Sequence, residues 1–83
     1  MVEFAHMSLV ERIARVLAGE ALSSNANGID PSAGDEVDRT WREHIPEALA
    51  VLHVIREPDQ AAAAAGDAEA WQRMVEASIA SAE

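Results

Sequence analysis

Cysteine is absent from this chain of 83 residues. Its absence excludes disulfide bridges, a thiolate nucleophile and a cysteine-based zinc site. The length corresponds to one domain, and a domain of this size buries only a limited core. Its stability therefore has to come from the packing of secondary structure, or partly from self-association.

Lysine is absent as well, so all six cations are arginine, and they face 15 acidic residues for a formal net charge of −9. Proteins that bind the phosphates of nucleic acids need clustered lysine and arginine. We therefore expect no nucleic-acid partner. The same charge disfavours an anionic membrane surface, whereas it allows a basic partner.

Long apolar runs are also missing, and none approaches the ~20 residues that a transmembrane helix requires. The first residues, which include Glu3, do not form a basic leader ahead of an apolar stretch. We therefore expect a cytoplasmic location without a membrane contact. Residues 1–7 are expected to be a flexible N-terminus or a helix extension, and residues 8–83 a single helical domain.

The segment that organises the chain, residues 40–57, has the sequence TWREHIPEALAVLHVIRE. Its apolar residues recur in steps of four and three, which place them on one face of an α-helix. They are Trp41, Ile45, Ala48, Leu52 and Ile55, with Leu49 on one shoulder and Val51 and Val54 on the other. A face this wide indicates contact with more than one neighbouring helix.

Pro46 lies inside this segment and has two interpretations. In a helix interior, proline loses one hydrogen bond and clashes with the carbonyl four residues back, which kinks the helix at a cost of ~3 kcal/mol. In the first turn of a new helix, the same residue costs little. Because the apolar stripe keeps its phase across Pro46, we expect one kinked helix in preference to two. Pro58 should end that helix, since the residue before a proline is pushed out of helical geometry.

The part of the chain before this segment predicts a first helix and a loop. Ser8 and Glu11 form the capping pattern S-x-x-E, which is typical of a helix start. The expected apolar face is Leu9, Val10, Ile13, Val16, Leu17 and Ala21, and the expected solvated side is Glu11, Arg12, Arg15 and Glu20. Residues 23–34 contain two turn signals and predict a loop, with Ile29 folded back onto the bundle. The central helix is expected to begin near Asp35, because acidic residues suit a first turn.

The part after Pro58 predicts one short and one longer helix. Five consecutive alanines favour a short helix with little to bury, and Gly66 is a natural stop. Asp67 should then cap a last helix. The expected apolar positions of that helix are Ala68, Trp71, Val75, Ser78, Ile79 and Ala82, with Met74 beside them. The sequence thus predicts an all-α bundle of three main helices plus one short helix, the central helix being kinked at Pro46.

The imidazoles of the chain, His6, His44 and His53, do not form a recognisable site. His44 and His53 are nine residues apart, so they face opposite sides of one helix and cannot chelate together. The zinc motif H-E-x-x-H is absent. We expect ordinary structural or exposed roles, with His44 partly buried at the edge of the apolar stripe.

Residues 23–34 have a superficial likeness to a helix–loop–helix calcium site. Ser23 would stand at position 1 and Gly34 at position 12, where the motif requires an aspartate and a bidentate glutamate. An ordinary polar turn is therefore favoured. Taken together, the residues predict no catalytic site, no cofactor and no metal ligand, and hence a protein that is not an enzyme.

Trp41 and Trp71 are the two largest side chains, and the ordinary interpretation packs both into the core. The alternative is that one of them is exposed and anchors a partner, because tryptophan is enriched at binding hot spots. Val51, Val54 and Met74 could extend such a patch.

The segment WREHIPEALAVLHVIREP, followed by AAG and then WQRM, resembles a group of short uncharacterised bacterial proteins, some of them phage-associated. Members of this group have a first helix of ERIAR type, a second helix that ends in REP, and a last helix with tryptophan and methionine. The resemblance covers residues 10–80. It implies a shared helical fold and a mobile-element origin, but no mechanism.

Three functions remain open at this point. The leading one is a non-catalytic interaction or structural protein that binds a protein partner or forms a homodimer. The second is an acidic inhibitor or decoy for a basic surface, which requires acidic groups to gather on one face. The third is a metal or small-ligand binder, which requires His44 or His53 to meet carboxylates in space.

Overall fold

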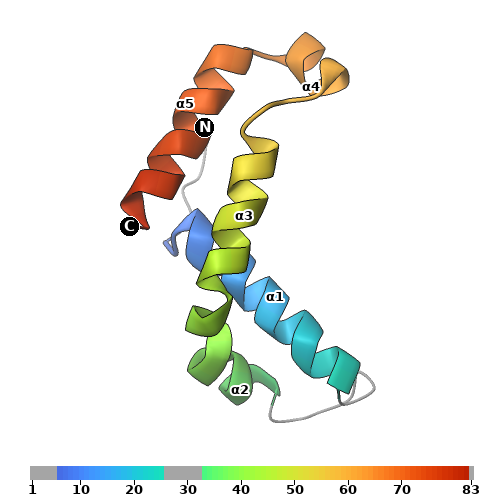
Figure 1. Cartoon of the computed structure of the whole chain (residues 1–83), viewed down its shortest axis with the longest axis vertical. Helices are drawn as coiled ribbons and strands as arrows, with labels where there is room; N and C mark the ends of the chain where they lie inside the picture. Colours follow the sequence, from blue (N-terminus) through green and yellow to red (C-terminus); the bar gives the residue numbers. More distant parts are fainter. Residues whose placement is uncertain (1–5, 26–32, 83) are drawn as a thin grey trace.

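The structure, a computed structural model, describes residues 6–25 and 33–82. Over these ranges the chain forms helices and no strands. They are α1 (Leu9–Asn25), α2 (Ala33–Thr40), the 3₁₀ helix η1 (Trp41–His44), α3 (Ile45–Ile55), α4 (Gln60–Ala65) and α5 (Ala68–Ser81). The predicted all-α bundle is confirmed, with α1, the run from α2 to α3, and α5 as its main helices and α4 as the short one (Figure 1).

The central segment is helical from Ala33 to Ile55, and its axis changes direction around η1 (Figure 1). The helix tightens to 3₁₀ geometry just before Pro46, which stands in the first turn of α3. There its fixed φ and missing N–H cost little. The kink and the new first turn therefore occur together, and the bend is taken up by the four residues of η1. The helix ends before Pro58, as predicted.

The loop predicted for residues 23–34 is shorter at both ends. Ser23 belongs to α1, and α2 begins at Ala33, two residues before the expected start at Asp35. Asp35 and Glu36 still lie in the first turn, as the positive end of the helix dipole favours. The interior of the loop, residues 26–32 with Ile29, lies outside the described residues, whereas Ser23 and Gly34 of the calcium-like pattern belong to helices α1 and α2.

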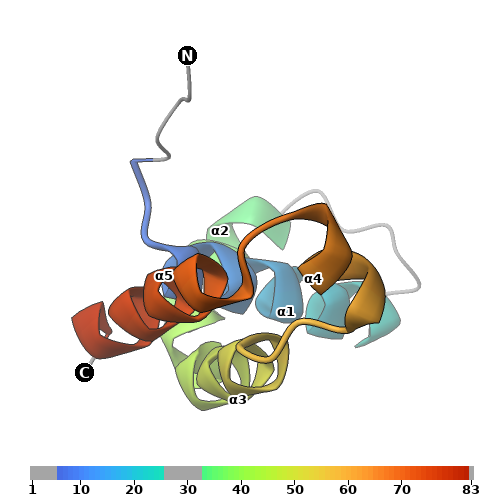
Figure 2. The ribbon, with the colours of Figure 1, turned by 90° about the horizontal axis from the view of Figure 1, so that it is seen from above.

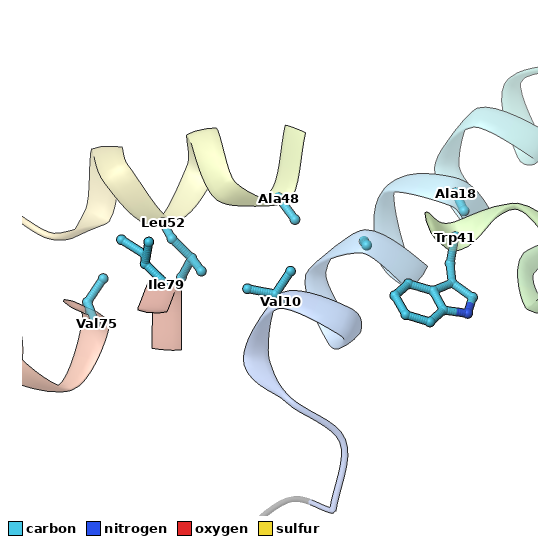
Figure 3. Packing of buried hydrophobic residues seen from close by; sticks show 8 residues of the cluster. Val10, Ala18, Trp41, Ala48, Leu52, Val75 and Ile79 are labelled. Carbon is cyan, nitrogen blue, oxygen red and sulfur yellow. The ribbon is translucent and has the colours of Figure 1, made fainter. Parts of the chain in front are cut away.

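Among the described residues, eight buried apolar side chains from α1, η1, α3 and α5 form the core. They are Val10, Ala14, Ala18, Trp41, Ala48, Leu52, Val75 and Ile79. Figure 3 shows Leu52 of α3 beside Ile79 of α5. The apolar stripe of the central segment is confirmed, because Trp41 and Leu52 are buried and Ile55 is half-buried. This segment contacts both α1 and α5, as the width of its apolar face indicated.

The predicted apolar face of α1 is wrong at its centre. Ala14 and Ala18 are fully buried there, whereas Val16 is 63% exposed and Ala21 is exposed. Where two helices cross, the distance between their axes depends on the side chains at the contact, so small residues allow the closest approach. Larger residues such as Leu17 then flank the crossing and are only partly buried.

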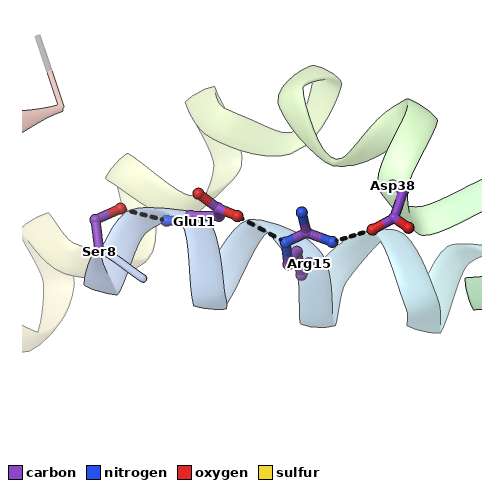
Figure 4. A network of polar contacts seen from close by, with 4 residues as sticks. All are labelled: Ser8, Glu11, Arg15 and Asp38. Carbon is purple, nitrogen blue, oxygen red and sulfur yellow. Dashed lines mark hydrogen bonds and ion pairs between the residues drawn. The ribbon is translucent and has the colours of Figure 1, made fainter. Parts of the chain in front are cut away.

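A chain of polar contacts joins α1 to α2 (Figure 4). The Ser8 hydroxyl accepts a hydrogen bond from the backbone N–H of Glu11 at 3.1 Å, which confirms the predicted cap. Arg15 Nε donates to Glu11 Oε2 at 2.9 Å, and its Nη1 donates to Asp38 Oδ1 at 2.6 Å. The guanidinium also lies 5.3 Å from the centre of the Trp41 ring. Arg15 was predicted on the solvated side, but it links two helices.

The molecule is elongated, with extents of 41 × 28 × 25 Å. Seen from above in Figure 2, α1 lies between α2 and α3. The short helix α4 lies at one end of the long axis, beside the start of α5 (Figure 1), and none of its residues is buried. Among the described helices, none has the length and apolar character needed to span a bilayer.

Candidate functional site: an apolar cleft at α4 and α5

The end of the molecule that carries α4 contains an open cleft of about 490 Å³. Its apolar lining includes Pro58, Ala62, Ala65, Ala70, Trp71 and Met74. A second hollow of about 300 Å³ shares Pro58, Ala62 and Trp71 with it and extends the apolar surface to Val54. We refer to the two together as the α4–α5 cleft. The larger hollow lies within the range of ~300–1,000 Å³ that is typical of binding pockets.

Two aspartates cap the N-termini of the helices that border the cleft. The Asp59 carboxylate accepts a hydrogen bond from the backbone N–H of Ala62 at 2.9 Å, which caps α4. The Asp67 carboxylate accepts from Ala70 N–H at 3.1 Å, which caps α5 as predicted. Both aspartates also belong to the lining of the cleft. The caps therefore fix two negative charges at its rim.

Trp71 joins the cleft to the body of the protein. Its indole N–H donates a hydrogen bond to the backbone carbonyl of Ile55 at 2.7 Å. An ion pair of 3.5 Å between Arg56 and Glu76 forms a second link from the end of α3 to α5. This pair is solvent-exposed and contributes little to stability. The position of α5 relative to α3 therefore depends mainly on Trp71 and on the packing of Leu52 deeper in the bundle.

The expectation that both tryptophans are core residues holds for Trp41 and is wrong for Trp71. Trp41 is 9% exposed, whereas Trp71 is 38% exposed and lines the cleft. Next to it Met74 is 66% exposed, and Val54 at the second hollow is 75% exposed. The structure therefore has the alternative arrangement, an exposed tryptophan extended by neighbouring apolar side chains. Val51 is exposed as well but does not line the cleft.

The charged residues in the lining of the cleft are all acidic: Glu57, Asp59 and Asp67. Between Arg56 and Arg73 the chain has no cationic residue and four carboxylates. These are Glu57, Asp59, Asp67 and Glu69, all of them exposed. The ion pairs found within the described ranges involve other carboxylates, such as Glu36 with Arg39. The lining of the cleft therefore contains negative but no positive side chains.

His6, His44 and His53 do not belong to the lining of the cleft. His44 is half-buried and its Nδ1 lies 3.2 Å from Glu47 Oε1, which agrees with the partly buried role predicted for it. His6 and His53 are exposed. Across residues 6–25 and 33–82, no group of three or more histidine, aspartate or glutamate side chains is arranged to hold a metal ion.

Sequence reasoning identified Trp71 and Met74 as candidates, but it missed the contribution of the alanines. Ala62, Ala65 and Ala70 line the cleft because their small side chains leave space beside the larger ones. The available signal was the run of alanines directly before a capped helix.

No protein-family model matches the chain, and no curated protein or solved structure is significantly similar to it.

Proposed function

We propose that this chain is a small, acidic, non-catalytic interaction protein and that the α4–α5 cleft is the surface by which it binds another protein. The observation that supports this function is the exposed Trp71 inside an apolar cleft. Tryptophan dominates binding hot spots, because a large rigid ring buries much area at a small cost in conformational entropy. Met74 adds flexible apolar surface that can adapt to a partner.

The proposal includes the cytoplasmic location and the bacterial mobile-element origin that the sequence led us to expect. Neither is needed for the cleft to bind a partner. A structural role in a larger assembly would use the same exposed apolar surface.

A second function, inhibition or mimicry at a basic surface, is favoured by one specific observation. The charged residues in the lining of the cleft, Glu57, Asp59 and Asp67, are all acidic, as an acidic binding face requires. This function and the first one use the same surface. They differ in whether the apolar lining contributes to the affinity.

Site-specific photo-crosslinking in cells that carry the gene tests the proposed function. A photoreactive residue is placed at Ala62, which lines the cleft, and separately at Glu20, which is exposed on α1. We expect one defined protein adduct from position 62, lost when Met74→Gln is added, and no such adduct from position 20. Equal adducts from both positions, or none from position 62, would contradict the proposal.

A further inference from the structure

The walls of the α4–α5 cleft restrict the conformation of what can occupy it. α4 and α5 are helices, and residues 6–25 and 33–82 include no strand whose edge an extended segment could join. An extended segment whose backbone N–H and C=O groups were buried against these walls would find no strand to pair with, which is costly. A helix satisfies these groups internally and presents only side chains. The walls of the cleft therefore favour a helical occupant over a segment that would add a strand to a sheet.

The lining of the cleft restricts the side chains that such a helix presents. Ala62 and Ala65 are small, while Trp71 and Met74 stand out beside them. Large apolar side chains of a partner can therefore enter between them, as ridges enter grooves when helices pack. The shared lining continues past Pro58 into the second hollow. The cleft is therefore able to contact a row of large apolar residues at positions i, i+3 or i+4 and i+7 of a partner helix.

The charge of the rim restricts the flanks of the partner. Asp59 and Asp67 are held by their capping hydrogen bonds at 2.9 and 3.1 Å, so their charges are fixed in place. Glu57 also belongs to the lining, which contains no cationic residue, and Glu69 lies nearby in the first turn of α5. Opposite charges across an interface steer association and select the partner.

A second copy of this chain is opposed by the same charges. Two molecules joined through the cleft would bring their acidic rims together, and juxtaposed like charges suppress association. Each copy also carries a net charge of −9.

We infer that the α4–α5 cleft binds an amphipathic helical segment of a partner protein, with one row of large apolar side chains flanked by arginine or lysine. This inference rests on the proposed function and specifies the chemistry of the partner.

Binding of designed peptides to the full chain tests it. Two labelled helical peptides carry the same row of leucines at i, i+4, i+7 and i+11, one flanked by arginine and the other by glutamate. We expect fluorescence anisotropy at low salt to show the arginine peptide binding at least about tenfold tighter. The ratio should shrink as added salt screens the rim charges.

Substitutions in the protein separate the contributions of charge and apolar contact. Replacing the rim by Glu57→Gln, Asp59→Asn, Asp67→Asn and Glu69→Gln removes the charge and keeps both caps, because asparagine caps as well as aspartate. This variant should bind the arginine peptide about tenfold more weakly. Met74→Gln should weaken binding about fivefold or more. Val16→Gln, at a residue of similar exposure on α1, should leave the affinity unchanged.

The results that overturn the inference are distinct from those that overturn the proposed function. If both peptides bind with equal affinity, the cleft does not select its partner by charge. If Met74→Gln leaves the affinity for the arginine peptide unchanged, the binding is unspecific electrostatic attraction, and the inference is wrong. A dimer in sedimentation that Met74→Gln dissociates makes a second copy the occupant. If neither peptide binds while the adduct at position 62 persists, the inference fails and the proposed function stands. If the rim variant does not fold, the salt dependence of the unmodified chain still decides the matter.

Discussion

The indole nitrogen of Trp71 lies 2.7 Å from the backbone oxygen of Ile55, so the first turn of α5 is hydrogen-bonded to the last residue of α3. This bond bridges 16 residues of sequence that include the whole of α4. It therefore holds together the two ends of the segment between Ile55 and Trp71, which borders the cleft. Trp71 has two roles, since the same ring fixes α5 and lines the cleft.

Replacing Trp71 by phenylalanine separates these two roles. The variant keeps an aromatic ring but loses the hydrogen bond, and a typical intramolecular hydrogen bond contributes about 0.5–1.5 kcal/mol. We expect a melting temperature lower by several degrees in circular dichroism, since ~1 kcal/mol corresponds to about 4–8 °C in a domain of this size. Met74→Leu, which changes the same cleft without a hydrogen bond, serves as the control and should melt as the parent does.

Leu52 and Val54 lie two residues apart on α3 and should respond very differently to truncation. Leu52 is fully buried, and its replacement by alanine leaves a cavity at a cost of about 2–5 kcal/mol. Val54 is 75% exposed, so Val54→Ala should change stability by less than about 0.5 kcal/mol. Urea unfolding measures both. A similar loss for the two variants would mean that α3 packs with a different face.

The two aspartate caps should also differ in their effect. Asp67 caps α5, which contributes Val75 and Ile79 to the core, so Asp67→Ala should destabilise the protein by about 1 kcal/mol. Asp59 caps α4, which buries no residue, so Asp59→Ala should lower helicity without shifting the unfolding transition. Comparing far-ultraviolet circular dichroism with urea unfolding distinguishes the two effects. Asp67→Asn should retain most of the stability.

The hydrogen bonds of Arg15 predict how the stability of the protein depends on pH. Its hydrogen bond to Asp38, and then that to Glu11, raise the pKa of the guanidinium above its ordinary value. The folded state therefore holds this proton more tightly, and the resulting stability is complete below the ordinary pKa of arginine and lost only above it. Arg15→Lys should lower the melting temperature by the same amount throughout ~pH 6–9. Arg12→Lys, at an exposed position of the same helix, should have no such effect. A loss confined to one end of that range would contradict this assignment.

Gly19 offers a route to a more stable protein. It lies inside α1, and a Cβ added there would meet its nearest neighbour, Val37 Cγ2, at 3.9 Å, an ordinary van der Waals contact. Alanine is favoured over glycine in a helix interior by about 0.5–1 kcal/mol. Gly19→Ala should therefore raise the melting temperature, and the reverse change Ala21→Gly, at an exposed position of α1, should lower it. A lower melting temperature for Gly19→Ala would show that α1 and α2 lie closer together than described.

The features that could be predicted from the sequence are those that depend on a few neighbouring residues. The caps at Ser8 and Asp67 follow from local hydrogen bonding, and the short alanine helix follows from propensity. The stripe from Trp41 to Ile55 follows from periodicity, because large apolar residues on one face have to be buried together.

The features that were missed depend on contacts between distant segments. Ala14 and Ala18 are buried because another helix crosses there, and a scale that ranks residues by size gives them little weight. Trp71 has the spacing of a core residue, yet it lies beyond the end of the packed part of α3, where no other described helix covers it fully. The conformation at Pro46 was open because the cost of an internal proline depends on whether the preceding turn can tighten.

The absence of buried residues in α4 has a consequence for how the protein can evolve. A substitution or a change of length between Pro58 and Gly66 alters the wall of the cleft without removing an atom from the core. Selection for a folded chain therefore leaves this wall almost free to vary. Related chains with the same folded body could diverge in what they recognise by changing this one turn and a half of helix.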